Sequence, residues 1–268
     1  MSNLPPLNTR RVSFADGLTI RVDERGSGHP ILILHGGGGP QAVDGIAAGL
    51  SKAHVLIPTH PGFGGEPRPE WLNSIDDLAY AYLDLLELLE LRDVLVIGYS
   101  MGGWIASAMA LRDTSHLMRG LVLINAAGIE VEGHPVVDIS NLTPDELSAL
   151  IFHNPAAFRV DPATVTPEQV EGGKANARAA AVYDQGLMSA DPKLKRRLSH
   201  VHIPVLVAWG ESDRILDQEY GRAYAQAFPD AHFELIPEAG HLSPIEQPER
   251  LMLLIRRFAI STRVASDV

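Results

Sequence analysis

The chain has 268 residues, of which 46% are hydrophobic and 21% charged, and its formal net charge is −11. An acidic balance disfavours nucleic acid and anionic membrane surfaces as partners, and the complete lack of cysteine excludes disulfides, a thiolate nucleophile and cysteine-ligated zinc. The first residues, MSNLPPLNTR, contain no apolar signal segment, and acidic residues interrupt the leucine-rich stretch 83–91. We therefore expect a soluble, cytoplasmic protein, and its length suits one core with an insertion as well as it suits two domains.

The first expected element is a β-hairpin, with strands at 11–14 and 19–24 around the turn residues Asp16 and Gly17. Six short apolar runs follow along the chain, at 31–34, 55–57, 94–97, 121–124, 205–209 and 233–236. Because these runs lack polar alternation, they are typical of strands that are covered on both faces, as in a parallel sheet.

Helical patterns separate the apolar runs, at 74–91, 100–112, 216–227 and 247–260. The first of these begins with Ser74 and Asp77, a capping box in which aspartate replaces the usual glutamate. Strands that alternate with helices predict an α/β protein with a doubly wound sheet. The alternation is interrupted between 126 and 200, a stretch with six prolines and an alanine-rich helical segment at 174–183. We expect a core domain formed by 1–125 and 201–268, and a helical lid insertion formed by 126–200.

The string GYSMGG at 98–103 is the strongest local motif, because it follows an apolar run directly and precedes a helical segment. A G-x-S-x-G string in this strand–turn–helix context predicts a nucleophile elbow. Gly98 and Gly102 remove the side chains that would collide in the sharp turn, which leaves the Ser100 hydroxyl exposed. The following helix N-terminus favours developing negative charge. Ser100 is therefore the predicted nucleophile.

A serine hydroxyl needs an adjacent base, and His241 is the best placed of the eleven histidines. It lies in a glycine-bearing loop after the last predicted strand and before the final helix. His60 is the second candidate, but it precedes Pro61 in the opposite half of the chain. His200 and His202 form an H-x-H string without further ligand spacing, so no metal site is predicted.

The base in turn needs a carboxylate that fixes its tautomer. Asp213 lies just beyond the carboxyl end of the run 205–209, where open α/β sheets place their sites. Glu211 and Asp217 remain competitors. The chain order Ser100, Asp213, His241 is the order that accompanies a nucleophile elbow.

The oxyanion of an acyl-transfer reaction needs preorganised donors, and backbone N–H groups can supply them. Met101, directly after the nucleophile, provides one, and Gly37 in the string HGGGGP (35–40) provides the other. Glycines allow the main chain to approach the substrate closely. The glycine string lacks the spacing of nucleotide-binding loops, so no nucleotide cofactor is predicted.

Five strings together resemble the α/β-hydrolase superfamily over nearly the whole chain: HGGGGP (35–40), HPGFGG (60–65), GYSMGG (98–103), WGESD (209–213) and GHLSPIEQPERL (240–251). The resemblance implies an eight-stranded, mostly parallel sheet, a helical lid near 126–200 and no cofactor. It also implies an acyl pocket between the lid and the loop after Gly37. The expected lining residues are Gly38, Phe63, Trp104, Ile129, Phe152, Phe158 and Met188.

The nucleophile separates this chain from epoxide hydrolases and haloalkane dehalogenases, which are similar but use aspartate at that position. The meta-cleavage-product hydrolases break carbon–carbon bonds and typically have asparagine before the nucleophile and tryptophan after the histidine. Here Tyr99 and Leu242 stand at these places. We expect hydrolysis of a small or medium uncharged carboxylic ester through an acyl-enzyme. The alternatives are C–C hydrolysis, cofactor-free perhydrolase or haloperoxidase activity, and a slow-turnover ligand receptor. A small molecule is the only partner expected, and the sequence does not indicate an oligomeric state.

Overall fold

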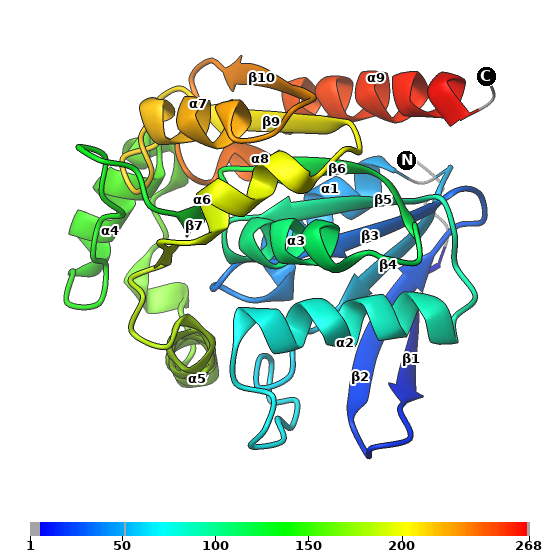
Figure 1. Cartoon of the computed structure of the whole chain (residues 1–268). Coiled ribbons are helices and arrows are strands. Elements are labelled where there is room, and N and C mark those ends of the chain that lie inside the picture. Colours follow the sequence, from blue (N-terminus) through cyan, green and yellow to red (C-terminus); the bar gives the residue numbers. More distant parts are fainter. Residues whose placement is uncertain (1–5, 51, 267–268) are drawn as a thin grey trace.

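The computed structural model describes residues 6–50 and 52–266, and its centre is an eight-stranded sheet (Figure 1). The strands are β1 (Asn8–Ser13), β2 (Thr19–Arg25), β3 (Pro30–Leu34), β4 (His54–Pro58), β5 (Val94–Tyr99), β6 (Met118–Ile124), β9 (Val205–Gly210) and β10 (Ala231–Ile236). Their spatial order is β1-β2-β4-β3-β5-β6-β9-β10. The pairs β1–β2 and β2–β4 are antiparallel and the other five are parallel. The predicted eight-stranded, mostly parallel sheet is confirmed.

The strands with continuous apolar runs are buried on both faces of the sheet. Alternate residues of β5 show this directly, because Val94 and Val96 belong to one core cluster while Leu95 and Ile97 belong to the other. The hairpin prediction is also confirmed, since Ser13 pairs with Thr19 across the turn.

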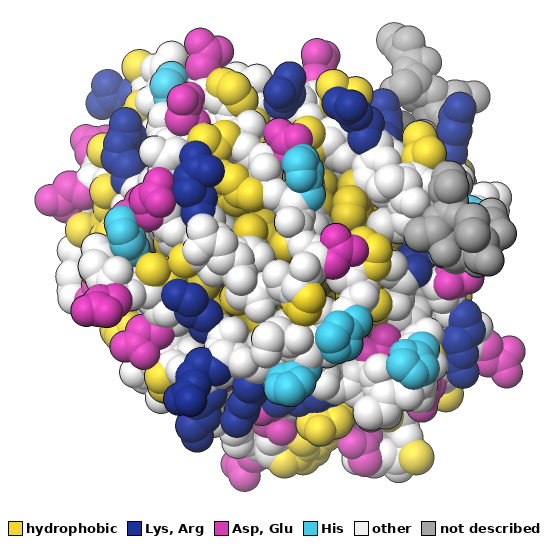
Figure 2. All heavy atoms as spheres, turned by 45° about the horizontal axis from the view of Figure 1, so that its top comes forward, with side chains coloured by type: hydrophobic (Ala, Val, Ile, Leu, Met, Phe, Trp, Pro, Cys, Tyr) yellow, Lys and Arg dark blue, Asp and Glu magenta, His cyan; other side chains and the backbone are white. Residues whose placement is uncertain are grey.

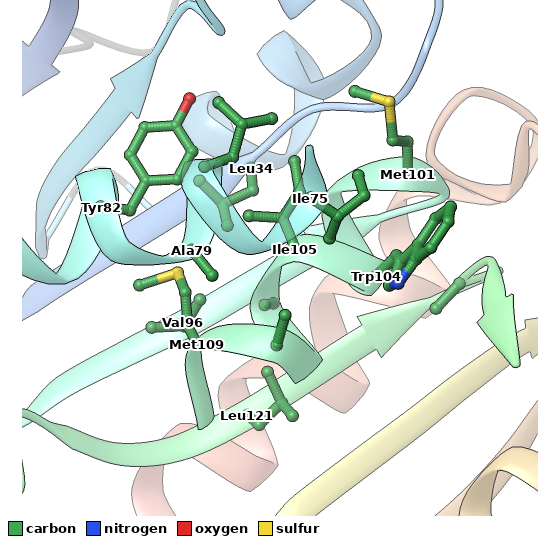
Figure 3. Close-up of a cluster of buried hydrophobic side chains, with 14 of the residues drawn as sticks. Leu34, Ile75, Ala79, Tyr82, Val96, Met101, Trp104, Ile105, Met109 and Leu121 are labelled. Carbon is green, nitrogen blue, oxygen red and sulfur yellow. The ribbon is translucent and has the colours of Figure 1, made fainter. Parts of the chain in front are cut away.

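Helices cover both faces of the sheet. The first cluster contains side chains of α2 (Ile75–Leu88), α3 (Met101–Arg112) and α7 (Gln218–Gln226). The second contains side chains of α1 (Asp44–Gly49), which follows the short turn η1 (Pro40–Val43), and of α9 (Pro248–Ser266), which follows the short helix α8 (Ser243–Glu246). Figure 3 shows part of the first cluster, in which α2 and α3 pack together over residues of β3, β5 and β6.

The predicted capping box begins α2 as expected. The Ser74 hydroxyl accepts a hydrogen bond from the Asp77 N–H at 3.1 Å, and the Asp77 carboxylate accepts one from the Ser74 N–H at 3.0 Å. The final helix is longer than its sequence pattern predicted, because it continues to Ser266.

Residues 126–200, between β6 and β9, are called the 126–200 segment. Most of them lie beyond the carboxyl ends of the strands, and the last ones return across a face of the sheet (Figure 1). Their regular elements are β7 (Gly128–Ile129), α4 (Pro144–Ile151), η2 (Pro155–Phe158), η3 (Pro162–Thr164), α5 (Pro167–Asp184), β8 (Ala190–Asp191), α6 (Leu194–Arg197) and η4 (Leu198–His200). The predicted helix 174–183 is the second half of α5, which starts earlier at a capping box of Thr166 and Gln169. That the 126–200 segment works as a lid remains a prediction.

On the face shown in Figure 2, acidic and basic side chains are interspersed, and apolar side chains lie between them. Within the described part of the chain, every helix is too short or too polar to cross a membrane.

Candidate active site

Ser100 occupies the turn between β5 and α3 in a strained backbone conformation, with φ 52° and ψ −119°. Such a conformation costs a non-glycine residue about 1–3 kcal/mol. The flanking glycines are required by close packing. A Cβ on Gly98 would lie 2.3 Å from the carbonyl oxygen of Gly102, and a Cβ on Gly102 would lie 2.1 Å from that of Leu34. The local sequence therefore permits a turn that larger residues would block. This turn places the Ser100 hydroxyl within hydrogen-bond distance of His241.

The structure brings the three predicted catalytic side chains into one hydrogen-bonded row. The Nε2 atom of His241 lies 3.1 Å from the Ser100 hydroxyl oxygen, and its Nδ1 atom lies 2.8 Å from Oδ2 of Asp213. Asp213 follows β9 and has no exposed side-chain surface, while His241 lies in the loop between β10 and α8. With Nδ1–H donating to the carboxylate, Nε2 is free to accept the hydroxyl proton.

Further hydrogen bonds hold the Asp213 carboxylate. Its Oδ1 accepts from the N–H groups of Ile215 at 2.9 Å and Leu216 at 3.0 Å. Its Oδ2 accepts from the amide of Asn125 at 2.7 Å, and Asn125 accepts in turn from the Ser243 hydroxyl at 2.6 Å. Sequence reasoning missed Asn125 and Ser243. The available signal was position, since Asn125 directly follows β6 and Ser243 is two residues beyond His241.

The competing carboxylates have other partners. Glu211 accepts a hydrogen bond from the N–H of Glu238 at 3.4 Å. Asp217 caps α7 by accepting from the Tyr220 N–H at 2.9 Å, and it also lies 2.6 Å from Nδ1 of His134. Of the three acids weighed from the sequence, Asp213 is the one that contacts His241.

The competing base, His60, is fully buried and engaged at both ring nitrogens. Its Nε2–H donates to the carbonyl oxygen of His35 at 2.9 Å, and its Nδ1 pairs with the Tyr82 hydroxyl. The ring stacks on that of His35 with centroids 3.6 Å apart. Burial lowers the pKa of His35 to about 4, and burial together with the neighbouring His35 lowers the pKa of His60. Both rings are therefore neutral near pH 7 and serve as structural connectors.

The glycine-rich loop 35–40 lies against the nucleophile, since a Cβ on Gly36 would be 3.0 Å from the Cβ of Ser100. The N–H groups of Gly37 and Met101 donate to no protein acceptor within residues 6–50 and 52–266. The Gly36 oxygen accepts from His35 Nδ1 at 2.8 Å and from the Gly39 N–H at 3.1 Å. Because Gly36 C=O and Gly37 N–H belong to one planar trans peptide, fixing the oxygen also fixes the direction of that N–H.

The predicted lining residues fall into two groups. Phe63, Trp104 and Ile129 are core residues with at most 3% exposure. The other group consists of the exposed Gly38 and Met188 and the half-buried Phe152 and Phe158. The rings of Phe152 and Phe158 stack with centroids 4.9 Å apart, and Met188 is 53% exposed. The substrate contacts expected of both groups remain predictions.

Within residues 6–50 and 52–266, no three His, Asp or Glu side chains are grouped so that they could hold a metal ion.

Comparison with known proteins identifies the family. The family model described as "Alpha/beta hydrolase family" matches residues 31–252. The chain belongs to the alpha/beta hydrolase family. Among its relatives, the 2-hydroxy-6-oxo-6-(2'-aminophenyl)hexa-2,4-dienoic acid hydrolase of Metapseudomonas resinovorans is 26% identical over 94% of this chain and 92% of that protein. Lipase 1 of Psychrobacter immobilis is 25% identical over 91% of this chain and 81% of that protein.

The solved structures agree with the fold of this alpha/beta hydrolase. A thermophilic esterase from Thermogutta terrifontis superposes with a TM-score of 0.76 at 24% identity, covering 95% of this chain and 99% of that one. The family and its relatives support hydrolase activity. Because the relatives include both a lipase and hydrolases of dienoic acids, they leave the type of bond open.

Proposed function

We propose that this alpha/beta hydrolase is a serine hydrolase that cleaves small or medium uncharged carboxylic esters, with Ser100 as nucleophile, His241 as base and Asp213 as acid. The observation that carries the proposal is the row of hydrogen bonds from Ser100 through His241 to Asp213, beside the unpartnered N–H groups of Gly37 and Met101.

The first half-reaction forms an acyl-enzyme. The Ser100 oxygen attacks the ester carbonyl carbon while its proton passes to Nε2 of His241, and Asp213 stabilises the resulting imidazolium. The carbonyl oxygen becomes an oxyanion that accepts from Gly37 and Met101, at the N-terminus of α3 where negative charge is favoured. The C–O bond then breaks, and the imidazolium returns the proton to the leaving alcohol.

The second half-reaction releases the acid. His241 takes a proton from water, the hydroxide oxygen attacks the acyl carbon, and the proton is returned to the Ser100 oxygen as its bond to carbon breaks. The overall change adds one water across the ester, and the protein is regenerated. These two half-reactions require a site that admits one acyl group and one water.

The choice of an uncharged substrate is supported by side chains near the site. The stacked rings of Phe152 and Phe158 belong to the 126–200 segment. The backbone of Phe152 lies against Gly240, the residue before His241, because a Cβ on Gly240 would be 2.9 Å from the carbonyl carbon of Phe152. Aromatic side chains favour an apolar acyl or alcohol group. We propose that the 126–200 segment is the lid that provides this surface, together with Gly38 and Met188.

C–C bond hydrolysis is the second candidate, favoured by the likeness to the hydrolases of dienoic acids. The residues beside the catalytic row favour ester chemistry over it. Tyr99, which precedes the nucleophile, is buried with its ring centroid 5.6 Å from that of His241. Leu242, which follows His241, gives no donor side chain at the place where the meta-cleavage hydrolases have tryptophan.

The two candidates are separated by one comparison on one preparation. We would measure kcat/KM for p-nitrophenyl esters of increasing acyl length, for p-nitrophenyl phosphate and for a 2-hydroxy-6-oxo-dienoate, with Ser100→Ala as the control. The proposal expects the highest value for a short or medium acyl ester and background rates for the control. A ratio that strongly favours the dienoate would replace ester hydrolysis by C–C hydrolysis, and preference for the phosphate would refute both.

A further inference from the structure

Helix α5 of the 126–200 segment contacts the glycine-rich loop through one buried amide. Asn176 is 8% exposed, and its Nδ2 donates to the Gly38 oxygen at 3.0 Å while its Oδ1 accepts from the Gly64 N–H at 3.0 Å. A Cβ on Gly39 would lie 2.6 Å from that Nδ2. The side chain of Asn176 therefore joins two loops that are distant in sequence, 35–40 and 60–65.

The same face of α5 also touches the loops at other points. The Cβ of Ala180 would lie 3.7 Å from a Cβ on Gly37, which is ordinary van der Waals contact. The Tyr183 hydroxyl donates to the Pro61 oxygen at 2.8 Å. Asn176, Ala180 and Tyr183 recur at helical spacing, so a single stripe of α5 covers both loops.

The loop 35–40 needs such contacts because its own sequence gives it little stiffness. Four consecutive glycines, 36–39, have unusual backbone freedom, which costs entropy when they are ordered. The structure holds the loop on both sides of Gly37. His35 binds the Gly36 oxygen from within the core, and Asn176 binds the Gly38 oxygen from α5. The donor N–H of Gly37 lies between these two restraints.

We propose that Asn176 is a positioning residue for the oxyanion hole, so that the Gly37 N–H is correctly aimed only while α5 is seated on the loop. The inference rests on the proposed function and extends it, because it couples the placement of the 126–200 segment to transition-state stabilisation. A donor that is preorganised stabilises the oxyanion without reorganisation. Movement of α5 away from the loop releases the Gly38 oxygen and the Gly39 N–H of the same peptide. Because that N–H helps His35 to hold the Gly36 oxygen, the direction of the Gly37 N–H is then less well fixed.

The test compares Asn176→Ala and Asn176→Asp with Tyr183→Phe. The aspartate keeps an acceptor for the Gly64 N–H and loses the donor to Gly38. Tyr183→Phe removes a hydrogen bond of the same helix to the other loop and leaves Gly38 bound. Three quantities would be measured: the rate of Ser100 labelling by a fluorophosphonate, kcat and KM for an activated ester, and hydrogen exchange of the Gly39 amide, which donates to Gly36.

Both Asn176 variants are expected to lower the labelling rate and kcat by about 10- to 100-fold, below the 10²–10³ of removing a donor outright. KM should change little and exchange at Gly39 should accelerate, while Tyr183→Phe stays within about threefold of the wild type in labelling rate and kcat. Wild-type rates in Asn176→Asp, or an equal loss in Tyr183→Phe, would overturn the inference. A wild-type protein that neither labels nor turns over ester would overturn the proposed function instead. Even if activity falls, unchanged hydrogen exchange at Gly39 in Asn176→Ala would refute the proposal that Asn176 restrains the loop.

Discussion

The buried pair of His35 and His60 makes the free energy of unfolding depend on pH in a window that the structure defines. Burial lowers the pKa of His35 from its ordinary value of 6.5 to about 4. Above pH 6.5 the ring is neutral in both the folded and the unfolded chain and has no effect on the pH dependence. As the pH falls from 6.5 towards 4, the unfolded chain binds a proton that the folded chain does not bind, so stability is lost.

The size of this loss of stability follows from the two pKa values of His35, 6.5 in the unfolded chain and about 4 in the folded chain. At pH 5 the linkage relation gives a loss of about 2 kcal/mol from His35, which approaches about 3 kcal/mol at still lower pH. The pKa of His60 is lowered too, so that ring adds a loss of the same sign. Both rings are held by hydrogen bonds that specify the neutral form, since each uses one nitrogen as donor and the other as acceptor.

The assay is urea unfolding of the wild type and of His35→Asn at pH 7.5 and pH 5.0. Asparagine does not titrate, and its amide can still donate to the Gly36 oxygen. Subtracting one protein from the other removes the carboxylates that titrate in both. The wild type should be the more stable at pH 7.5, and its advantage should shrink by about 2 kcal/mol at pH 5.0. A difference that stays constant between the two pH values would refute the reasoning.

Three further predictions concern the site and its frame. Asp213→Asn should lower kcat by about 10⁴-fold because it favours the wrong tautomer of the base, whereas Glu211→Gln should cost less than about tenfold; steady-state kinetics that rank them in the opposite order would reassign the acid. Gly102→Ala should lower the free energy of unfolding by about 3 kcal/mol or more, because its Cβ would lie 2.1 Å from a backbone oxygen. Gly173→Ala on α5 has open space around its Cβ and should raise that free energy by about 0.5–1 kcal/mol. Thermal melts check both, and equal shifts in Tm would contradict the packing argument. Asn125→Ala should cost about 1–3 kcal/mol, because it leaves the buried Ser243 hydroxyl without its acceptor and removes one of the hydrogen bonds to Asp213. It should also lower kcat, and unchanged kinetics would show that the amide does not orient the acid.

The sequence predicted the features that depend on local patterns. Buried strands were recognisable because both faces are covered, and α2 was recognisable from its capping box at Ser74. The tight turn at Ser100 was recognisable because the close packing around it requires glycine at two nearby positions, Gly98 and Gly102. Asp213 and His241 could be predicted to meet because the chain order and the strand ends constrain where their side chains lie.

Features that depend on contacts between distant residues could not be predicted in this way. Asn125 and Ser243 are 118 residues apart, and Asn176 meets the glycine loop across 138 residues. A polar residue in a helix gives no sequence signal of a buried partner, so nothing distinguished Asn176 from its neighbours in the alanine-rich part of α5. The elements α1, α4 and α8 are short, with 4–8 residues each, and too few turns repeat for a periodic pattern to stand out.

The proposed mechanism depends above all on Ser100 as the nucleophile, activated by His241. The most direct measurement is peptide mapping by mass spectrometry after treatment with a fluorophosphonate, on the wild type and on His241→Ala. We predict one adduct per chain, on the peptide that contains Ser100, and labelling slowed by several orders of magnitude in the variant. An adduct on a different residue, no adduct in the wild type, or equal labelling in His241→Ala would contradict the claim.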